Sequence, residues 1–243
     1  MMYLDNLDYK SAVKLLTEYF DNSAVSAERM AQLSIQVTKE VKEISQEPLK
    51  PPAPALENWL KVRDYLINVR SLPYELVDWM HLNGKVYADR FHNAVFVREK
   101  GGAFVRGTKD KSFFRTIGNK AQGSFILQGD GDVWICESPI DAASIKSYAP
   151  QAHVISTGGN IIKLSEVSIP VGRKVFAAFD NDSKGQKFTD ELIKIHPATK
   201  SFRPPSGKDW NASIQNNDQL IDSDWLEKSI FKESKTSKFR SKI

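Results

Sequence analysis

The sequence is poor in the two residue types that most often form cross-links or zinc sites. It has a single cysteine, Cys136, and four scattered histidines, His81, His92, His153 and His196. One cysteine cannot make a disulfide framework, and the histidines do not show the ligand spacing of a zinc module. These absences exclude disulfide-stapled domains and cysteine-based zinc sites.

Long apolar segments are also absent. No run approaches the roughly 20 residues that a membrane-spanning helix needs, and the start of the chain lacks the charged-then-apolar pattern of a secretory leader. We therefore expect a cytoplasmic protein with no membrane partner. Of the 243 residues, 41% are hydrophobic and 26% are charged, which is ordinary for a soluble protein with a packed core. The net charge of +4 is small, so its distribution matters more than its total.

The clearest local pattern is a short apolar run that ends in a carboxylate. Residues 133–136 follow the turn Asp130-Gly131 and indicate a buried strand. Glu137 comes next, and Ser138-Pro139 then opens a helical pattern with proline in its first turn. Because open α/β sheets hold their ligands at the carboxyl ends of strands, Glu137 is a candidate site residue.

A second apolar run follows about forty residues later. Residues 175–179 precede Asp180-Asn181-Asp182, and a helical pattern through Ile195 comes after them. Two parallel strands would bring these aspartates and Glu137 to one edge of a sheet. Side chains i and i+2 of an extended chain point the same way, so we expect the two aspartates to converge. Carboxylates that converge repel one another unless a cation joins them, which indicates a site for Mg²⁺ or Mn²⁺.

These segments resemble a known domain. A glutamate at a strand end and a later Asp-x-Asp are similar to the Toprim domain of topoisomerases and DnaG-type primases. The chain is most similar to the Toprim-like proteins of plasmids and mobile elements, which carry a domain of unknown function ahead of the Toprim part. Four segments in the right order match their pattern: Glu137–Ala142, Thr157–Asn160, Asp180–Asp182 and Lys208–Asn211. The resemblance covers roughly residues 60 to 227.

The resemblance implies an α/β fold class. We expect a Toprim-type, Rossmann-like parallel sheet with flanking helices, preceded by a small α+β basic subdomain and N-terminal helices. The expected parts are N-terminal helices at 1–47, a proline-rich linker at 48–55, the basic subdomain at 56–128, the Toprim domain at 129–227 and a basic tail at 228–243.

The N-terminal part has two amphipathic patterns, at residues 1–20 and 26–44. The first is either an ordinary terminal helix or the counterpart of the last helix of a primase zinc-binding domain. Because the zinc ligands are absent, the second alternative would make this chain a truncated or degenerate relative.

The subdomain should begin with two helices within residues 56–83. Pro73 opens the second of them, and Asn83-Gly84 is a typical helix end. The first is expected to be lined by Trp59, Val62, Leu66 and Val69. Short strands with tight turns follow from Val86 to Leu127, in the pattern of an antiparallel sheet.

Positive charge gathers in this antiparallel unit. Between residues 90 and 120 stand eight basic and two acidic residues, a balance of +6. The interleaved phenylalanines are either core residues or exposed rings that stack on unpaired bases: Phe91, Phe104, Phe113 and Phe114. Because basic side chains neutralise phosphates, we expect a nucleic-acid-binding face made by Arg106, Lys109, Arg115 and Lys120.

The resemblance adds residues from the C-terminal segment. Asp209 is expected as a further metal ligand, Lys208 and Lys184 as phosphate-binding residues, and the large Trp210 as a packing anchor. Asp141 is expected to stabilise its helix or to orient Lys184. In the matching pattern an acid often follows Asn211, whereas this chain has Ala212.

The function implied is Mg²⁺-dependent phosphoryl transfer on nucleic acid, foremost as a DNA primase-like nucleotidyltransferase in plasmid or mobile-element DNA replication. Asp180 and Asp182 would hold one or two metal ions, and Glu137 would bind a metal or act as general acid/base. Expected partners are a single-stranded DNA template, nucleotides, and a replicative helicase or relaxase. Two alternatives stay open: a Toprim nuclease with the same carboxylates, and a non-catalytic single-stranded-DNA-binding accessory in replication or mobilisation.

Overall fold

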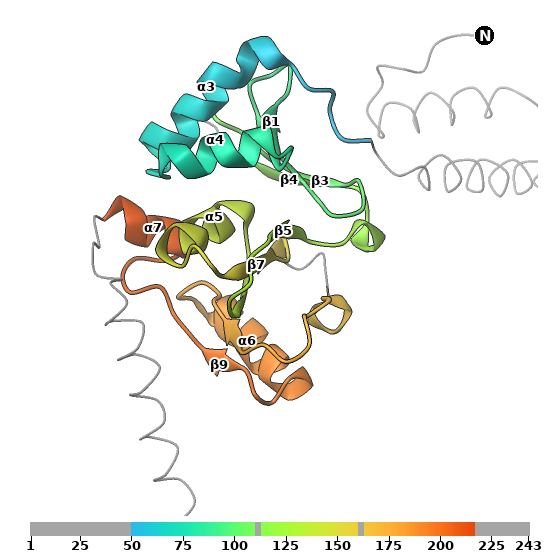
Figure 1. Cartoon of the computed structure of the whole chain (residues 1–243), viewed down its shortest axis with the longest axis vertical. Coiled ribbons are helices and arrows are strands. Elements are labelled where there is room, and N and C mark those ends of the chain that lie inside the picture. The colour runs from blue at the N-terminus through green and yellow to red at the C-terminus, as the bar shows by residue number, and fades with distance from the viewer. Residues whose placement is uncertain (1–49, 110–112, 160–162, 217–243) are drawn as a thin grey trace, which may run out of the picture. The chain divides into compact units, whose positions relative to one another are not determined.

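The computed structural model describes residues 50–109, 113–159 and 163–216 (Figure 1). All of the described residues belong to one compact unit. The helices expected at 1–20 and 26–44 and the basic tail at 228–243 lie outside the described residues. Within the described ranges, no helix is both long and apolar enough to cross a membrane.

The two helices expected within residues 56–83 are present. The first changes type along its length, from a 3₁₀ turn, η1 (Leu56–Asn58), through α3 (Trp59–Asp64) to a π turn, η2 (Tyr65–Val69). The second, α4 (Tyr74–Leu82), follows Pro73 and ends before Gly84, whose φ of 64° suits glycine.

Val69 does not line the core. It is 53% exposed, so its predicted packing role was wrong. The π turn η2 is wider than an α-helical turn, and the face that an α-helical spacing predicts is therefore not kept to its end.

The next four strands form the predicted antiparallel sheet, in the order β1-β2-β3-β4. They are β1 (Val86–Ala88), β2 (Ala94–Val97), β3 (Ala103–Arg106) and β4 (Phe114–Ile117). One face, with Phe96 and Phe104, joins the main core, whereas the other carries a small cluster around Val95 and Val105. β4 is an edge strand of this sheet, so side chains on both of its faces can reach the surface.

A second sheet has the order β5-β7-β6-β8-β9. Its strands are β5 (Phe125–Leu127), β6 (Val133–Cys136), β7 (His153–Ser156), β8 (Val175–Ala177) and β9 (Lys200–Ser201). All neighbours pair in parallel except β5, which is antiparallel to β7. The boundary expected at residue 128 places β5 with the basic subdomain, but β5 pairs within the second sheet.

Helices cover both faces of this sheet: α5 (Pro139–Tyr148), α6 (Ser183–Ile195) and α7 (Trp210–Gln215), with short turns at η3 (Lys120–Gln122) and η5 (Leu164–Glu166). Leu192 of α6 packs on one face with Ile135 and Ile155, and the other face joins the core that includes α5 and Trp210. This architecture confirms the predicted α/β fold class, with a Rossmann-like sheet preceded by a smaller α+β part.

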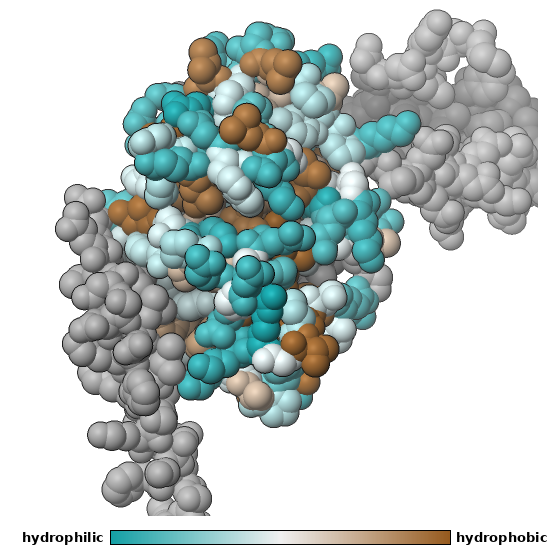
Figure 2. Space-filling model, viewed as in Figure 1, coloured by the Kyte–Doolittle hydropathy of each residue, from teal (hydrophilic) through white to brown (hydrophobic). Residues whose placement is uncertain are grey.

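One core connects the two sheets. Phe96 of β2 meets Phe125 of β5 edge to face, with ring centroids 5.5 Å apart, and both rings belong to the same buried cluster as Trp134 and Trp210. Trp210 is almost fully buried and its Nε1 donates a hydrogen bond to the Ala178 carbonyl at 3.0 Å, which confirms its role as a packing anchor. Figure 2 shows that apolar side chains also reach the surface over the α3–α4 end.

Candidate functional site

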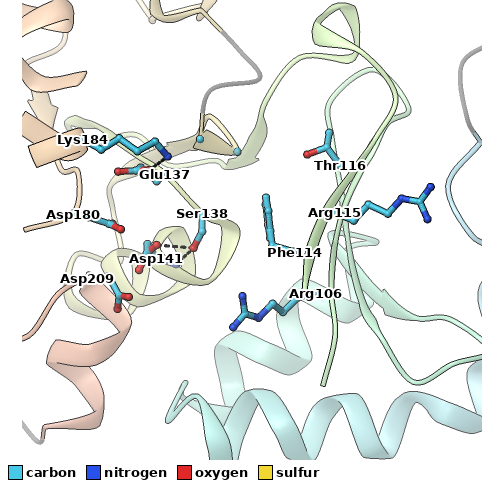
Figure 3. A pocket seen from close by; sticks show the side chains of 12 residues that line it. Arg106, Phe114, Arg115, Thr116, Glu137, Ser138, Asp141, Asp180, Lys184 and Asp209 are labelled. Atoms are coloured by element: carbon cyan, nitrogen blue, oxygen red, sulfur yellow. Dashed lines mark hydrogen bonds and ion pairs between the residues drawn. The ribbon is translucent and has the colours of Figure 1, made fainter. Parts of the chain in front are cut away.

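A cavity of about 600 Å³ lies between the two sheets, at the carboxyl ends of β6 and β8. One wall carries the carboxylates of Glu137, Asp141, Asp180 and Asp209. The other wall comes from β3 and β4, and there Figure 3 shows the side chain of Arg106 extending toward the carboxylates. The cavity therefore places an acidic wall opposite a partly basic one.

Glu137 follows β6 directly and is only 8% exposed. Its carbonyl oxygen accepts hydrogen bonds from Gly158 N at 2.8 Å and Gly159 N at 3.2 Å, so the glycine turn after β7 fixes its backbone. Its Oε2 accepts a hydrogen bond from Lys184 Nζ at 2.9 Å, whereas its Oε1 is buried without a partner. Lys184 is thus held by Glu137 and not by Asp141, so of the two alternatives for Asp141 the orientation of Lys184 does not occur.

Asp180 comes three residues after Ala177, the last position that pairs in the parallel ladder, and it also has a buried carboxylate oxygen, Oδ1, without a partner. Burial, together with the negative charges of Asp141 and Glu137, raises the pKa of Asp180 to about 8. The turn is packed tightly, because a Cβ at Gly185 would lie 2.1 Å from the Asp180 carbonyl oxygen. The start of α6 therefore lies directly against the backbone of Asp180.

Asp141 stabilises the start of α5, which is one of the two roles expected for it. Its Oδ2 accepts a hydrogen bond from Ser138 Oγ at 2.5 Å, and Ser138 Oγ in turn accepts one from Asp141 N at 3.2 Å. Burial and the charge of Asp209 raise the pKa of Asp141 to about 6. Asp141 therefore stabilises the start of α5 and is also part of the acidic wall of the cavity.

Asp182 and Asp209 each cap a helix. Asp182 Oδ1 accepts a hydrogen bond from Gly185 N at 2.8 Å, and Asp209 Oδ1 accepts one from Ala212 N at 2.7 Å. The hydrogen bond from Gly185 lowers the pKa of Asp182. Asp209 still lines the cavity, but Asp182 is not among its lining residues, because its side chain turns to the free N–H groups at the start of α6.

The carboxylates are the kind of ligand that a hard divalent cation prefers, but as they are arranged they do not form a complete set of metal ligands. In the described part of the chain, no three acidic, histidine or cysteine side chains are close enough to hold a metal ion as they stand. Glu137 and Asp180 nevertheless line the same cavity, and each has a buried carboxylate oxygen without a partner, Oε1 and Oδ1. Burying such oxygens is unfavourable unless a cation or donor joins them, and an all-carboxylate set suits Mg²⁺ or Mn²⁺.

The predicted basic residues divide into three groups. Arg106 and Arg115 line the cavity, and Arg106 Nε also lies 3.5 Å from the Tyr65 hydroxyl. Lys109 is exposed in the turn after β3, while the side chain of Lys120 lies outside the described residues. Lys208 is exposed beside the α6 cap, with its Nζ 3.9 Å from Asp182 Oδ2, and does not line the cavity.

Arg98 belongs to the charge cluster by sequence but has a structural role. It is 1% exposed and its guanidinium donates hydrogen bonds to the carbonyls of Gly123 at 2.6 Å and Asn119 at 2.8 Å. It also lies over the ring of Phe104, which is buried. The other three interleaved phenylalanines, Phe91, Phe113 and Phe114, are exposed. One of the four rings is therefore a core residue, and the other three have the exposure that base stacking requires.

Asn211 connects the acidic wall to the helical segment, a role that the sequence did not reveal. Its Nδ2 donates hydrogen bonds to the Arg70 carbonyl at 2.7 Å and to Ser144 Oγ at 3.2 Å. Its backbone N–H donates to Asp141 Oδ1 at 3.3 Å. The only sequence signal for Asn211 was its place in the Lys208–Asn211 segment. Its contact with Arg70 could not be predicted, because the two residues are 141 positions apart. Ser138 and Phe114 are further lining residues that were not predicted.

Comparison with known proteins yields two family matches and several similar structures. Residues 64–131 match a family described as a protein of unknown function, DUF3991, and residues 134–214 match the Toprim-like family. No curated protein matches the chain.

Two of the similar solved structures are primases. The primase fragment of the bacteriophage T7 primase-helicase has 16% identity and a TM-score of 0.48, over 63% of this chain and 69% of that chain. The zinc-binding and RNA polymerase domains of Aquifex aeolicus primase have 15% identity and a TM-score of 0.37, over 88% and 66%. From the two family matches, the chain contains a Toprim-like domain at residues 134–214, preceded by a DUF3991 domain at residues 64–131.

Proposed function

We propose that the cavity is a divalent-metal-dependent centre for phosphoryl transfer on nucleic acid, and that its reaction is DNA primase-like nucleotidyl transfer. One observation carries the proposal: Glu137 and Asp180 line a cavity whose opposite wall carries Arg106, and each has a buried carboxylate oxygen without a partner, Oε1 and Oδ1. A metal bound to the carboxylates and an arginine across from it suit a polyanionic substrate. That substrate would be a single-stranded DNA template with nucleotides.

Each residue then has a distinct task. Glu137 and Asp180 would hold Mg²⁺ or Mn²⁺ through their unpaired oxygens, with Asp209 as a further ligand in the same cavity. When bound, the metal offsets the negative charge of the reacting phosphates. Lys184 fixes Oε2 of Glu137, which leaves Oε1 for the metal or for the proton of the attacking hydroxyl.

The remaining residues position these groups. Arg106 would bind a phosphate from the opposite wall, where Figure 3 shows its guanidinium on the carboxylate side of β3. Asp182 would act through the α6 cap, because the same turn carries Asp180.

The decisive experiment is ribonucleotide incorporation on a single-stranded template with Mg²⁺ or Mn²⁺, run beside plasmid nicking. Incorporation that needs both metal and template supports the proposal. Nicking without incorporation would assign the carboxylates to a nuclease, and the absence of both activities would leave a binding accessory. The likeness to Toprim-like proteins of plasmids and mobile elements favours a role in their replication, with a replicative helicase or a relaxase as partner.

Asp180→Asn should weaken Mg²⁺ and Mn²⁺ binding by about tenfold or more, which corresponds to about 1.4 kcal/mol. Asp182→Asn should have a smaller effect, because asparagine can also cap α6 and because Asp182 does not line the cavity. Titration calorimetry on both variants, with circular dichroism to check the fold, tests this order. Unchanged affinity in Asp180→Asn would contradict the metal assignment.

Replacing Arg106 and Arg115 by alanine should flatten the salt dependence of single-stranded-DNA affinity. Each lost phosphate contact lowers the slope by about 0.7, so the pair should lower it by about 1.4. Fluorescence anisotropy of a labelled oligothymidylate across a salt series measures the slope. Lys174→Ala with Lys194→Ala is the matched control, because both lysines are exposed and neither lines the cavity. Equal slopes in the two double variants would place the contacts elsewhere.

A further inference from the structure

A second cavity lies behind β4, on the face of the antiparallel sheet that points away from the carboxylates. It has a volume of about 610 Å³ and is bounded by Pro52–Ala55, Phe91 and the outer face of β3 and β4. Successive side chains of a strand point to opposite faces. Accordingly, Phe114 and Thr116 line the carboxylate cavity, whereas the second cavity, here called the β4 groove, is lined by Phe113, Arg115 and Ile117.

The β4 groove presents two phenylalanine rings to solvent. Phe91 is 56% exposed and Phe113 is 46% exposed. The ring of Phe113 rests against Gly107, where a Cβ would come within 2.7 Å of it, and the Phe113 carbonyl accepts a hydrogen bond from Gly107 N at 2.9 Å. The backbone N–H of Phe91 donates to Asp89 Oδ1 at 2.8 Å. Both rings are therefore exposed on a fixed backbone, as in surfaces on which bases stack.

The charges around the groove favour a polyanion. Arg90 lies over the Phe91 ring, with its Cζ 4.6 Å from the ring centroid, and Arg115 lines the groove from β4. Of the acidic lining residues, Asp89 is buried, and its carboxylate accepts three hydrogen bonds of 2.8 Å from the backbone of Phe91 and from Asn93. Glu57 lies at the linker end of the groove. Among the described residues, the exposed charges next to the rings are thus those of these two arginines.

The β4 groove and the carboxylate cavity lie on opposite faces of the sheet and share one lining residue. Arg115 lines both cavities, and Figure 3 shows its guanidinium pointing away from the carboxylates. A strand with an end at the carboxylates would cross β4 at Arg115 and then reach Phe113 and Phe91. Along this path a nucleic-acid strand would meet the guanidinium of Arg115 first and the two phenylalanine rings after it.

We propose that the β4 groove binds unpaired bases of a nucleic-acid strand, which stack on Phe91 and Phe113 while Arg90 and Arg115 bind the adjoining phosphates. The inference rests on the proposed function in taking nucleic acid as the substrate, but it needs neither metal nor catalysis. Stacking recognises the flat face common to all bases, so the groove would hold a template without selecting its sequence.

The test measures binding in the presence of EDTA, so that the carboxylate site cannot contribute through a metal. Wild-type protein is titrated with an oligothymidylate and with an abasic oligonucleotide of the same length, which keeps the phosphates and lacks the bases. The wild type should bind the base-bearing strand about tenfold or more tightly. Phe91→Ala with Phe113→Ala should lose this preference while the salt slope stays unchanged.

Two control variants sharpen the result. Phe91→Tyr with Phe113→Tyr keeps both aromatic faces and should keep the preference. Leu82→Ala removes an exposed apolar side chain of α4 outside the groove and should leave binding unchanged. Thermal unfolding of each variant verifies that the fold is kept.

A wild type that binds both strands equally, or a preference that survives loss of both rings, would overturn the inference. Its failure is distinguishable from that of the proposed function. Metal-dependent incorporation without a base preference would support the catalytic proposal and contradict base binding in the β4 groove. A base preference that depends on Phe91 and Phe113, in a protein without incorporation activity, would do the opposite.

Discussion

Glu137→Gln should lower metal-dependent turnover by about a hundredfold or more, the usual scale for a general acid/base. The substitution is nearly isosteric, and a glutamine carbonyl can still accept the hydrogen bond from Lys184. What it removes is the anionic oxygen at Oε1, which is buried without a hydrogen-bond partner on a residue that lines the cavity. Affinity for single-stranded DNA should be kept or increased, because a negative charge near the phosphates is gone.

Steady-state ribonucleotide incorporation and DNA anisotropy, measured on the same preparations, separate these two effects. Glu191→Gln is the matched control, because Glu191 is exposed on α6 and lies away from the cavity. Full turnover in Glu137→Gln would rule out a catalytic or ligand role for this carboxylate. A wild type inert toward all nucleotide and DNA substrates would decide for the non-catalytic accessory.

Asp180→Asn should stabilise the metal-free protein at high pH. The folded-state pKa of Asp180 is about 8, raised from an ordinary 3.8 by burial and by neighbouring carboxylates. The folded state therefore holds a proton that the unfolded state releases, and metal-free wild type loses stability as pH rises from about 4 through about 8. Asparagine carries no charge at any pH. Allowing for the partial exposure of Asp180, the gain at pH 9 should be about 1–3 kcal/mol.

For a chain of this size the corresponding Tm shift is about 2–4 °C per kcal/mol. Scanning calorimetry in EDTA at pH 5 and pH 9 measures it, with Asp190→Asn, an exposed change on α6, as the control. The shift should be large at pH 9 and small at pH 5. Adding Mg²⁺ at pH 9 should raise the Tm of wild type but not of Asp180→Asn. A shift of equal size at both pH values would contradict the raised pKa.

The sequence was informative where a buried strand ends in a charge. The apolar runs before Glu137 and Asp180 predicted strands β6 and β8, because a short apolar run bounded by turn residues is typical of a buried strand. The direction of the Asp182 side chain was harder to predict, because two rules give different answers. The alternation of an extended chain points it with Asp180, but the free N–H groups at the start of α6 attract its carboxylate instead.

Contacts between distant segments could not be read from the pattern. The partner of Lys184 lies 47 positions away, and nothing in the order of residues distinguishes Glu137 from Asp141 as its acceptor. Arg98 shows the same limit for charge, because a count of basic residues does not separate a guanidinium buried among backbone carbonyls from one facing solvent. Burial and through-space pairing decide both cases.

The two family matches divide the chain at a place where the fold does not. Strand β5 falls within the 64–131 match, yet it is the outer partner of β7 in the 134–214 match. A recombination event that joined the Toprim-like segment to an unrelated upstream sequence would leave β7 with unpaired backbone groups along its length, an edge prone to aggregation. It would also separate Asn211 from the carbonyl of Arg70. The Toprim-like segment therefore depends on the segment before it for an edge strand and for the acceptor of Asn211.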